Sequence, residues 1–351
     1  MAISYKKNWK TGVLALGWLS LCTTACSDDE GGSGSLTVLL ESEDVIVDGL
    51  EAGDETENIR DGWDVIFDKY VVVLGDIDLH FSTDENVEAE AEDIFAVDLT
   101  EVPSSGLPLW GFDDLRAGRW EFNYATSGGG HGAIRDETVS KDDFDEMVDH
   151  DWTYLIEGEL TNEDGQSCPP ESLAEPGDKE PNGNTSGAND CYDAESISFV
   201  IGAAAETSFG PCEIDGVAGI SVPSGGTQTA AVTIHGDHIF FNGFPEGGEG
   251  GVRRQAQWLA DCDLNLDGAV TQEELEAITP SQLPAMEDYQ FGGAPIEPTD
   301  MYQYVRAQLK TQGHYEGEGE CPVDGVAHEH GDEDDHDDDH DDDHDDDHDD
   351  E

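Results

Sequence analysis

Basic residues are scarce in this chain. Its 351 residues include 14 Lys and Arg against 83 Asp and Glu, which gives a formal net charge of −69. Phosphate backbones are bound through basic side chains, so this charge excludes a nucleic-acid partner, and an anionic membrane surface would repel the protein. Residues 328–351 hold seventeen of the acidic residues, so most of the negative charge lies elsewhere. We expect an acidic surface suited to cations.

Long hydrophobic runs are missing as well, and this limits how the chain can meet a membrane. The stretch VLALGWLSL at residues 13–21 is too short to span a bilayer, and Lys6, Lys7 and Lys10 precede it. A positive region followed by a short apolar run is typical of an export signal. We therefore expect residues 1–25 to be a signal peptide that is removed.

The end of this signal indicates how the exported protein is held. Residues 23–26 read TTAC and resemble the processing motif of bacterial lipoproteins. The resemblance implies that Cys26 is lipidated and that its acyl chains anchor the protein in the bacterial cell envelope, as a periplasmic or cell-surface protein. Secretion after cleavage at Ala25, without a lipid, is the alternative. The polar residues 26–35 are then expected to form a flexible tether.

Sequence fingerprints of common enzymes are absent too, since the chain has no GxSxG, HExxH, phosphate-binding or dinucleotide-binding motif. Most of the body is β-type sequence. Runs rich in Val, Ile and aromatic residues are separated by Gly, Pro and acidic turns. These runs cover residues 36–40, 63–81, 94–100, 118–126, 152–161, 196–209 and 229–241. The pattern predicts a mainly β fold, an antiparallel β-sandwich over residues 36–322.

Helical patterns are few and lie mostly near the carboxyl end. Residues 141–148 form one short candidate, and residues 251–262, 271–278 and 300–313 form a group. We therefore expect a small helical element attached to the sandwich, of the EF-hand type over 251–278. A disordered acidic tail is expected to follow over residues 323–351.

Five cysteines remain once the signal peptide and the lipidated residue are set aside. In an oxidising compartment they allow two disulfides and one thiol. Cys168 and Cys191 bracket a loop rich in Pro, Gly and Asn, and we expect a bridge that closes this loop. A second bridge between Cys212 and Cys321 would tie the end of the ordered chain to the core, which leaves Cys262 as the thiol.

The most specific motif is DLNLDGAVTQEE, residues 263–274, which fits the twelve-residue calcium loop of an EF-hand. Calcium prefers about six to eight oxygen ligands. The expected ligands are the side chains of Asp263, Asn265, Asp267 and Thr271, the backbone carbonyl of Ala269, and the carboxylate of Glu274. Gly268 permits the sharp turn between them. The sequence therefore predicts one bound Ca²⁺ at this loop.

The surroundings of the loop support this interpretation but leave an alternative. Residues 251–262 and 271–278 can form an entering and a leaving helix, yet Thr271 and Glu274 also match the capping box that begins many helices without a metal. No second loop with this spacing is present. We therefore expect a weak site, with a dissociation constant on the order of 10⁻⁴–10⁻³ M, that stabilises the fold rather than acting as a sensor.

Histidines outside the tail indicate a second metal site. The sequence HGDH lies in a strand-like run, where alternation places His235 and Asp237 on one face and His238 on the other unless Gly236 marks a bulge. His314 lies in the alternating sequence GHYEGEGE. These two histidines, Asp237 and His314 are candidate ligands for zinc or copper. The alternative is that the histidines pair with one another or with the backbone at strand ends.

The last segment is the most unusual in composition. Its six histidines are His328, His330, His336, His340, His344 and His348. Like charges repel and Asp is a poor helix former, so we expect no stable structure without a cation. His-rich tracts bind transition metals, here Zn²⁺, Ni²⁺ or Cu²⁺, whereas carboxylates alone gather Ca²⁺ or Mg²⁺ weakly. A solubilising acidic brush without a selected ligand is the alternative.

Long parts of the body resemble a group of uncharacterised exported bacterial lipoproteins with a β-sandwich core and a single EF-hand-type calcium loop. The resemblance rests on WDVIFDKYVVVLGDIDL, FAVDL and AGRWEF, and further on TIHGDHIFF, the calcium loop and GHYEGEGEC. It spans most of residues 36–321. It implies a fold and export, and it implies no reaction.

These features together predict a lipid-anchored, exported, non-catalytic metal-binding protein. Ca²⁺ would occupy the loop at 263–274, and the tail would bind transition metals loosely. Two alternatives are open: a structural or adhesive cell-surface module that calcium only stabilises, and a metal-dependent hydrolase that uses His235 and His238. No protein partner follows from the residues.

Overall fold

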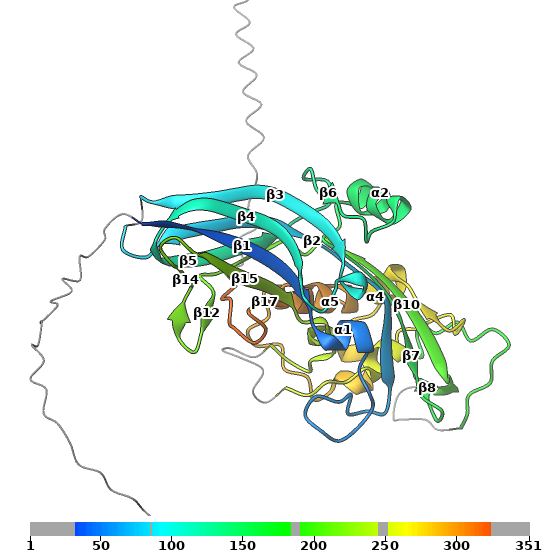
Figure 1. Cartoon of the computed structure of the whole chain (residues 1–351). Helices are drawn as coiled ribbons and strands as arrows, with labels where there is room; N and C mark the ends of the chain where they lie inside the picture. The colour runs from blue at the N-terminus through cyan, green and yellow to red at the C-terminus, as the bar shows by residue number, and fades with distance from the viewer. Residues whose placement is uncertain (1–31, 85, 184–189, 245–251, 324–351) are drawn as a thin grey trace, which may run out of the picture.

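The computed structural model describes residues 32–84, 86–183, 190–244 and 252–323, and over these residues strands dominate (Figure 1). The mainly β class predicted from the sequence is thereby confirmed. The longer strands are β1 (Ser33–Ser42), β2 (Asp64–Phe81), β3 (Glu88–Asp98), β4 (Leu107–Arg116), β5 (Gly118–Thr126), β7 (Tyr154–Thr161), β10 (Ser196–Ala203) and β15 (Thr227–Ile234). The shorter ones are β6 (Ile134–Arg135), β8 (Gln166–Ser167), β9 (Tyr192–Asp193), β11 (Thr207–Phe209), β12 (Glu213–Ile214), β13 (Val217–Ala218), β14 (Ile220–Val222), β16 (Ala269–Val270) and β17 (Gly313–Tyr315).

Two larger sheets carry these strands. One has the order β17-β15-β1-β4, and the other runs β11-β5-β2-β7-β10-β16, with β14 paired to β5, β3 to β2 and β6 to β3. The expectation of a wholly antiparallel fold is wrong, because β1–β15, β10–β16 and β3–β6 are parallel pairs. Parallel neighbours need a long connection, and nearly the whole second sheet lies in sequence between β1 and β15.

Alternating burial gives the first sheet one buried face. Leu36, Val38 and Leu40 of β1 are buried at every second position, as a half-buried strand requires. They belong to one hydrophobic cluster that also includes Trp63 and Tyr70 and draws on both larger sheets. Side chains at the ends of the strands in the first sheet can therefore lie on a face that is shielded from water.

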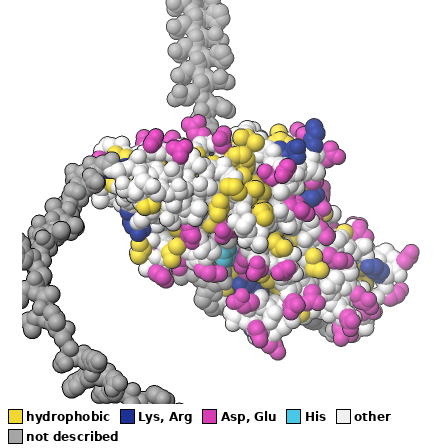
Figure 2. Space-filling model, in the orientation of Figure 1, with side chains coloured by type: hydrophobic (Ala, Val, Ile, Leu, Met, Phe, Trp, Pro, Cys, Tyr) yellow, Lys and Arg dark blue, Asp and Glu magenta, His cyan; other side chains and the backbone are white. Residues whose placement is uncertain are grey.

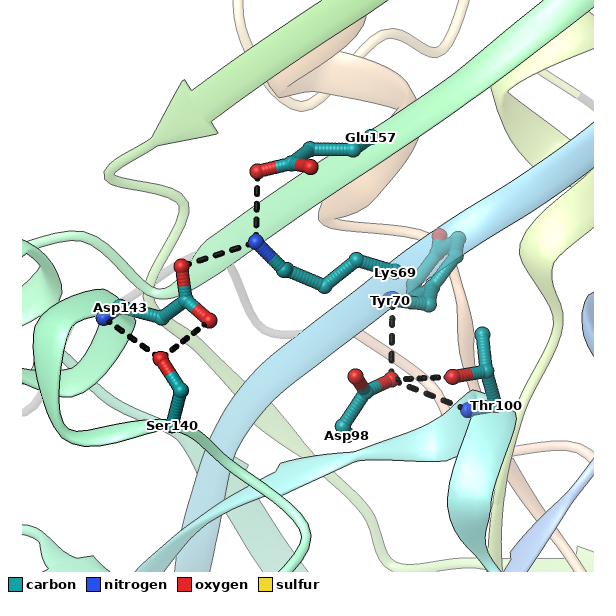
Figure 3. Close-up of polar contacts among 7 residues, drawn as sticks. All are labelled: Lys69, Tyr70, Asp98, Thr100, Ser140, Asp143 and Glu157. Carbon is teal, nitrogen blue, oxygen red and sulfur yellow. Dashed lines mark hydrogen bonds and ion pairs between the residues drawn. The ribbon is translucent and has the colours of Figure 1, made fainter.

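Helix α2 (Lys141–His150) lies against the outer side of β2 and β7 and is fastened there by a lysine (Figure 3). Lys69 Nζ donates to Asp143 Oδ1 at 2.8 Å and to Glu157 Oε1 at 2.6 Å. Burial alone would lower the pKa of Lys69, but its bonds to the two carboxylates outweigh burial and raise it. Ser140 caps the helix by accepting from the N–H of Asp143 at 3.1 Å. The ion triad therefore joins three elements without a metal.

The remaining helices are short and lie mostly near the carboxyl end. They are α1 (Asp44–Asp48), α3 (Gln257–Ala260), α4 (Gln272–Ala277) and α5 (Met301–Leu309), with 3-10 turns η1 (Leu99–Glu101), η2 (Gly236–Phe240), η3 (Pro280–Gln282) and η4 (Pro284–Met286). None of the described helices is long and apolar enough to cross a membrane.

The entering helix expected over 251–262 is much shorter than predicted. Ahead of α3 the backbone is extended, because the carbonyl of Arg253 accepts from Asn242 and the N–H of Gln255 donates to Phe240. The helix begins where Asp61 Oδ2 accepts from the N–H of residues 256 and 257, each at 2.8 Å. Pairing with a distant segment thus replaces the first helical turns.

Two other predicted boundaries also change. The tether expected over 26–35 overlaps β1, which begins at Ser33, and Val323, expected in the tail, forms a bridge with Phe209. Strand β4 was not predicted, since its sequence LPLWGFDDLR contains a proline, a glycine and paired acids. It lies at the edge of its sheet, where pairing on one side is sufficient.

Candidate metal centre

Two parallel strands bring a carboxylate and a histidine to one edge of the first sheet. Strands β1 and β15 pair so that Ser42 lies opposite Ile234. The next residues, Glu43 and His235, therefore leave the sheet at the same end. Glu43 precedes α1 but its side chain does not cap that helix. Its Oε1 lies 3.7 Å from Nδ1 of His235 instead.

A tight turn after β15 brings in a second histidine. The strand ends at Ile234, and η2 follows at once. Residues three apart in a 3-10 helix project to the same side, so the rings of His235 and His238 lie with centroids 5.7 Å apart. A Cβ at Gly236 would lie 2.5 Å from Cγ1 of Ile46, so only glycine fits the turn. The two histidines do not diverge as they would on a regular strand, because the chain turns at Gly236.

The third histidine comes from β17. His314 lies opposite Thr233 in the antiparallel pair of β17 and β15. Its ring stacks on that of His235 with centroids 3.8 Å apart, and lies 5.2 Å from that of His238. One ligand nitrogen from each ring lies within 4.8 Å of the other two. His235 and His238 are 1% and 4% exposed, so the fold brings the distant His314 to two buried histidines that lie three residues apart.

For the neutral form of two of the rings, hydrogen bonds indicate which nitrogen carries the proton. His235 Nε2 lies 3.0 Å from the carbonyl of Gly317, which only accepts, so Nδ1 carries the lone pair. His238 Nδ1 lies 2.9 Å from Oγ1 of Thr311, whose own proton goes to the carbonyl of Gln308 at 2.7 Å. The hydroxyl therefore accepts from Nδ1, and Nε2 of His238 carries the lone pair. Outer hydrogen bonds of this kind orient the histidine ligands of metal sites.

Two carboxylates lie beside these rings. Donor atoms of Glu43, His235 and Asp237 lie within 4.8 Å of one another. Asp237, a predicted ligand, is fully buried and forms an ion pair with Arg254 through its Oδ2, so one of its oxygens serves the arginine. Glu43 adds a carboxylate whose side chain is 22% exposed and whose Oε1 lies 3.7 Å from His235 Nδ1. Carboxylates beside the rings favour a positive charge there, on a protonated histidine or on a metal ion.

Tyr70 lies in the same environment. Its hydroxyl donates to Oε1 of Gln312 at 2.7 Å, and the carbonyl of that glutamine accepts from the N–H of His235 at 3.0 Å. Burial raises the pKa of Tyr70 well above its usual range, and the negative charges of Asp237 and Glu43 add to the rise. The phenol therefore stays neutral at physiological pH, and the local potential is negative.

The predicted calcium loop has the turn that its sequence requires. Asp263 accepts from the N–H of Asp267 at 3.1 Å and of Gly268 at 3.0 Å. Gly268 has a φ of +88°, in the left-handed region that favours glycine. From the other end of the loop, Glu274 accepts from the N–H of Leu264 at 3.0 Å. Backbone donors thus draw both terminal carboxylates toward the middle of the loop.

The carboxylates of the loop are close enough to repel one another. Burial raises the pKa of Asp263, and the negative charges of Glu274 and Asp267 add to the rise against a hydrogen bond from Gly268. The three carboxylates are not among the described groups whose donor atoms all lie within 4.8 Å, so a shared cation would draw them closer. The capping box of Thr271 and Glu274, on which the alternative interpretation depends, is present.

The loop is attached to the body of the protein on both sides. Strand β16 within it pairs in parallel with β10, with Ala269 opposite Ser198, and the N–H of Ser198 donates to the carbonyl of Gly268 at 2.9 Å. The N–H of Glu175 donates to the carbonyl of Leu264 at 2.7 Å. The second sheet therefore supplies the loop with a partner strand, although the chain has no second EF-hand loop.

A third group of possible ligands combines His131, which the sequence suggests as a loop residue or a ligand, with two carboxylates that were not predicted. His131 Nδ1 lies 3.0 Å from Oε1 of Glu206, and its Nε2 lies 3.6 Å from Oδ2 of Asp151. The glycine-rich loop before it donates to both carboxylates, from Gly128 at 2.7 Å and from Gly130 at 2.9 Å. Because each ring nitrogen faces a carboxylate, this arrangement suits ion pairing within the protein as well as a cation.

The structure contains both favoured disulfides, Cys168–Cys191 and Cys212–Cys321. The first closes the loop that contacts Leu264, and the second ties the segment after β17 to β12. Cys262 is a buried thiol, and burial raises its pKa well above the usual range. It is therefore expected to be unreactive.

Several predicted sites lie outside the described residues. They are the signal peptide 1–25, the lipidated Cys26 and the tail histidines 328, 330, 336, 340, 344 and 348. No protein-family model, no curated protein and no solved structure matches the chain. The resemblance to exported bacterial lipoproteins therefore stays a prediction, and the chemistry of the sites follows from their own residues.

Proposed function

We propose that this protein is an exported metal-binding protein whose specific transition-metal site is the three-histidine cluster of His235, His238 and His314. The observation that carries the proposal is the pair of outer hydrogen bonds that the rings of His235 and His238 donate to Gly317 and Thr311, which leave the lone pairs of the two rings for a metal ion. Imidazole nitrogen favours Zn²⁺, Cu²⁺ or Ni²⁺ over Ca²⁺. The carboxylates beside the rings favour a positive charge there.

In this proposal the loop at 263–274 binds Ca²⁺ and stabilises the fold. The attachment of its strand to β10 and of Leu264 to the disulfide loop supports a structural role. The interpretation of the two sheets as a sandwich belongs to the same proposal, supported by their shared hydrophobic cluster. The EF-hand interpretation rests on the loop itself, since the helix before it has only four residues.

The proposal keeps the protein in the bacterial cell envelope through a lipid on Cys26. Its tail would collect metal ions loosely, with many weak ligands and no defined geometry. A surface rich in acidic side chains and poor in Lys and Arg, as in Figure 2, suits that role. A hydrolytic centre would use the same three histidines and hold a water at the fourth position of the metal.

The test is a zinc titration of the chain in which the six tail histidines are replaced by Asn. Competition with a chelating dye should show one tight zinc site per chain. His238→Asn with His314→Asn should weaken that site by at least the 10–100-fold that loss of an outer-shell partner alone costs. The matched control, His80→Asn with His150→Asn, removes two imidazoles elsewhere and should bind like the parent. Equal binding by all three chains would refute the proposal.

The tail is tested separately with two chains. Deletion of residues 328–351 removes imidazoles and carboxylates, whereas replacement of the six histidines by Asn keeps the carboxylates. Capture by the tail predicts that both changes lower zinc stoichiometry at neutral pH. A solubilising brush predicts that neither does, and that only the deletion affects solubility.

A further inference from the structure

The disulfide loop, residues 168–191, contacts the first part of the proposed calcium loop. The first of the two bridges closes it. The N–H of Cys168 donates to Asp261 Oδ1 at 2.8 Å, and the N–H of Glu175 donates to the carbonyl of Leu264 at 2.7 Å. Asp261 ends helix α3, and Leu264 is the second residue of the calcium loop. Backbone donors of the disulfide loop therefore hold the entry to the calcium loop at two points.

Leu264 connects this contact to predicted calcium ligands. It lies between Asp263 and Asn265 in the sequence. Its carbonyl accepts from the disulfide loop, and its own N–H donates to Oε1 of Glu274 at 3.0 Å. The position of a residue between two ligands, and the orientation of a third ligand, therefore depend on a segment far away in the sequence.

The disulfide loop has little regular structure that could hold it in place. Over its described residues 169–183 it contains turns but no helix or strand. At its base, β8 and β9 pair over only two residues each. Loss of the bridge would raise the conformational entropy of such a segment, because its two ends would no longer be joined. We therefore expect the bridge to be what keeps the N–H of Glu175 beside Leu264.

We propose that the bridge between Cys168 and Cys191 sets the calcium affinity of the loop at 263–274, so that the reduced chain binds Ca²⁺ more weakly than the oxidised chain. This inference rests on the proposed function and adds the regulation of one of its sites. The affinity of EF-hand loops depends on the rigidity of the site as well as on the charge of its ligands. The bridge supplies rigidity at the start of this loop.

Formation of the bridge needs an external oxidant, and the disulfide of a small thiol or of an oxidoreductase is sufficient. One S–S bond forms between Cys168 and Cys191, whose thiols give up two protons and two electrons. The external disulfide takes up both and leaves as two thiols. Such disulfides persist in oxidising compartments and are rare in the cytosol. An exported chain would therefore gain its full calcium affinity only after export.

One side chain of the disulfide loop acts in the opposite direction. Burial raises the pKa of Asp263, whereas the positive charge of Lys179 acts to lower it, so this lysine would also repel a bound calcium ion. Lys179 is exposed, however, and water and salt screen its charge. Release of the disulfide loop would remove this weak repulsion together with a direct hydrogen bond to Leu264. The loss of the hydrogen bond is expected to dominate.

The test is thermal unfolding of the full chain over a series of calcium concentrations, which gives an apparent dissociation constant. Cys168→Ser with Cys191→Ser removes the bridge and should raise this constant about tenfold, which corresponds to one or two hydrogen bonds. The matched control is Cys212→Ser with Cys321→Ser, which removes the other bridge. It should lower the stability of the fold and keep the dissociation constant of the parent.

A second variant leaves both bridges in place. Glu175→Pro removes the N–H that donates to Leu264 and should raise the dissociation constant about 2–10-fold. Glu175→Ala removes the side chain but keeps this N–H, so it should bind calcium like the parent. This pair tests the contact itself without changing any cysteine.

The outcomes separate failure of this inference from failure of the proposed function. The response that remains in Asp263→Ala with Glu274→Gln comes from other carboxylates and is subtracted from each titration. A parent with no response above this background would overturn calcium binding at the loop, and the proposed function with it. A parent that responds, with a constant that neither loss of the first bridge nor Glu175→Pro changes, would overturn the coupling alone. Equal weakening on loss of either bridge would overturn the coupling as well.

Discussion

The two regions proposed to bind metal take their geometry from different levels of structure. In the loop at 263–274, ligands lie two residues apart and a single glycine shapes the turn, so the chain itself carries the geometry. In the histidine cluster, the groups come from the end of β1, the turn after β15 and strand β17. Parallel and antiparallel pairing with β15 brings them together. The first kind of site can be recognised in a sequence, and the second requires the sheet.

The largest expected effect concerns the ion pair that joins the two regions. Arg254 lies on the segment that leads to the calcium loop, and its partner Asp237 belongs to the turn of the cluster. Arg254→Met leaves that aspartate buried without a cation, so unfolding in urea should show a loss of about 3–5 kcal/mol. The neighbouring, exposed Arg253→Met should cost no more than about 0.5 kcal/mol. Similar losses in both variants would show that the buried pair contributes nothing special.

The next effect concerns the outer hydrogen bond of the cluster. Thr311→Val removes the hydroxyl that accepts from His238, so that ring is no longer held with its lone pair toward the metal. Zinc affinity, measured by dye competition, should fall about 10–100-fold, while calcium-dependent stability is unchanged. Thr311→Ser keeps a hydroxyl and should bind like the parent. Unchanged affinity in the valine variant would contradict the assigned tautomer.

The loop should respond to a different ion. With a dissociation constant of 10⁻⁴–10⁻³ M, about 10 mM Ca²⁺ should stabilise the fold by roughly 1.4–2.7 kcal/mol. Asp263→Ala with Glu274→Gln should abolish this gain in thermal unfolding and leave zinc affinity unaltered. Glu273→Gln, at the exposed neighbouring position, is the control. If the double variant keeps its calcium response, the capping box alone explains the motif.

The smallest expected effect concerns helix α2, which the ion triad of Lys69, Asp143 and Glu157 holds without a metal. Lys69→Met should loosen α2 and cost about 1 kcal/mol, since the triad is partly exposed. Bonds from Lys69 and Ser140 outweigh burial and hold the pKa of Asp143 below its ordinary value of 3.8. The stability that the triad contributes is therefore lost as pH falls through that lowered pKa. The raised pKa of Lys69 means that it is also lost as pH rises above 10.5. Urea unfolding across that range should show the difference between parent and variant disappear at both ends.

Much of the β framework could be predicted from the sequence, because alternation and β-branched runs are local signals. Strand β2 shows this, since the predicted 63–81 differs from the observed Asp64–Phe81 by one residue. Strand β4 could not be predicted, since its proline and acids are tolerated only at an edge. Gly236 itself indicated a possible turn in the sequence. The packing of Ile46 that makes glycine necessary there is a tertiary contact, which the sequence does not show.

The candidate site was only partly predictable for the same reason. His235, His238 and His314 could be named from residue type, whereas their approach depends on strand register. The sequence does not distinguish Glu43 and Thr311 as site residues, because a glutamate before a short helix and a threonine after a helix are both common. Only the pairing of Ser42 with Ile234 and the position of Thr311 after α5 give them a role.

The pairing of β1 with β15 also has a consequence for the order of events in folding. Strand β1 is the first described strand, yet one of its two neighbours begins at Thr227, so the first sheet has a very long-range contact at its centre. Such topologies fold slowly, because a large loop must close before its contacts form. An exported chain would have to deliver most of its length before this sheet can assemble. Under the proposed function, metal capture at the cluster would then follow folding rather than guide it.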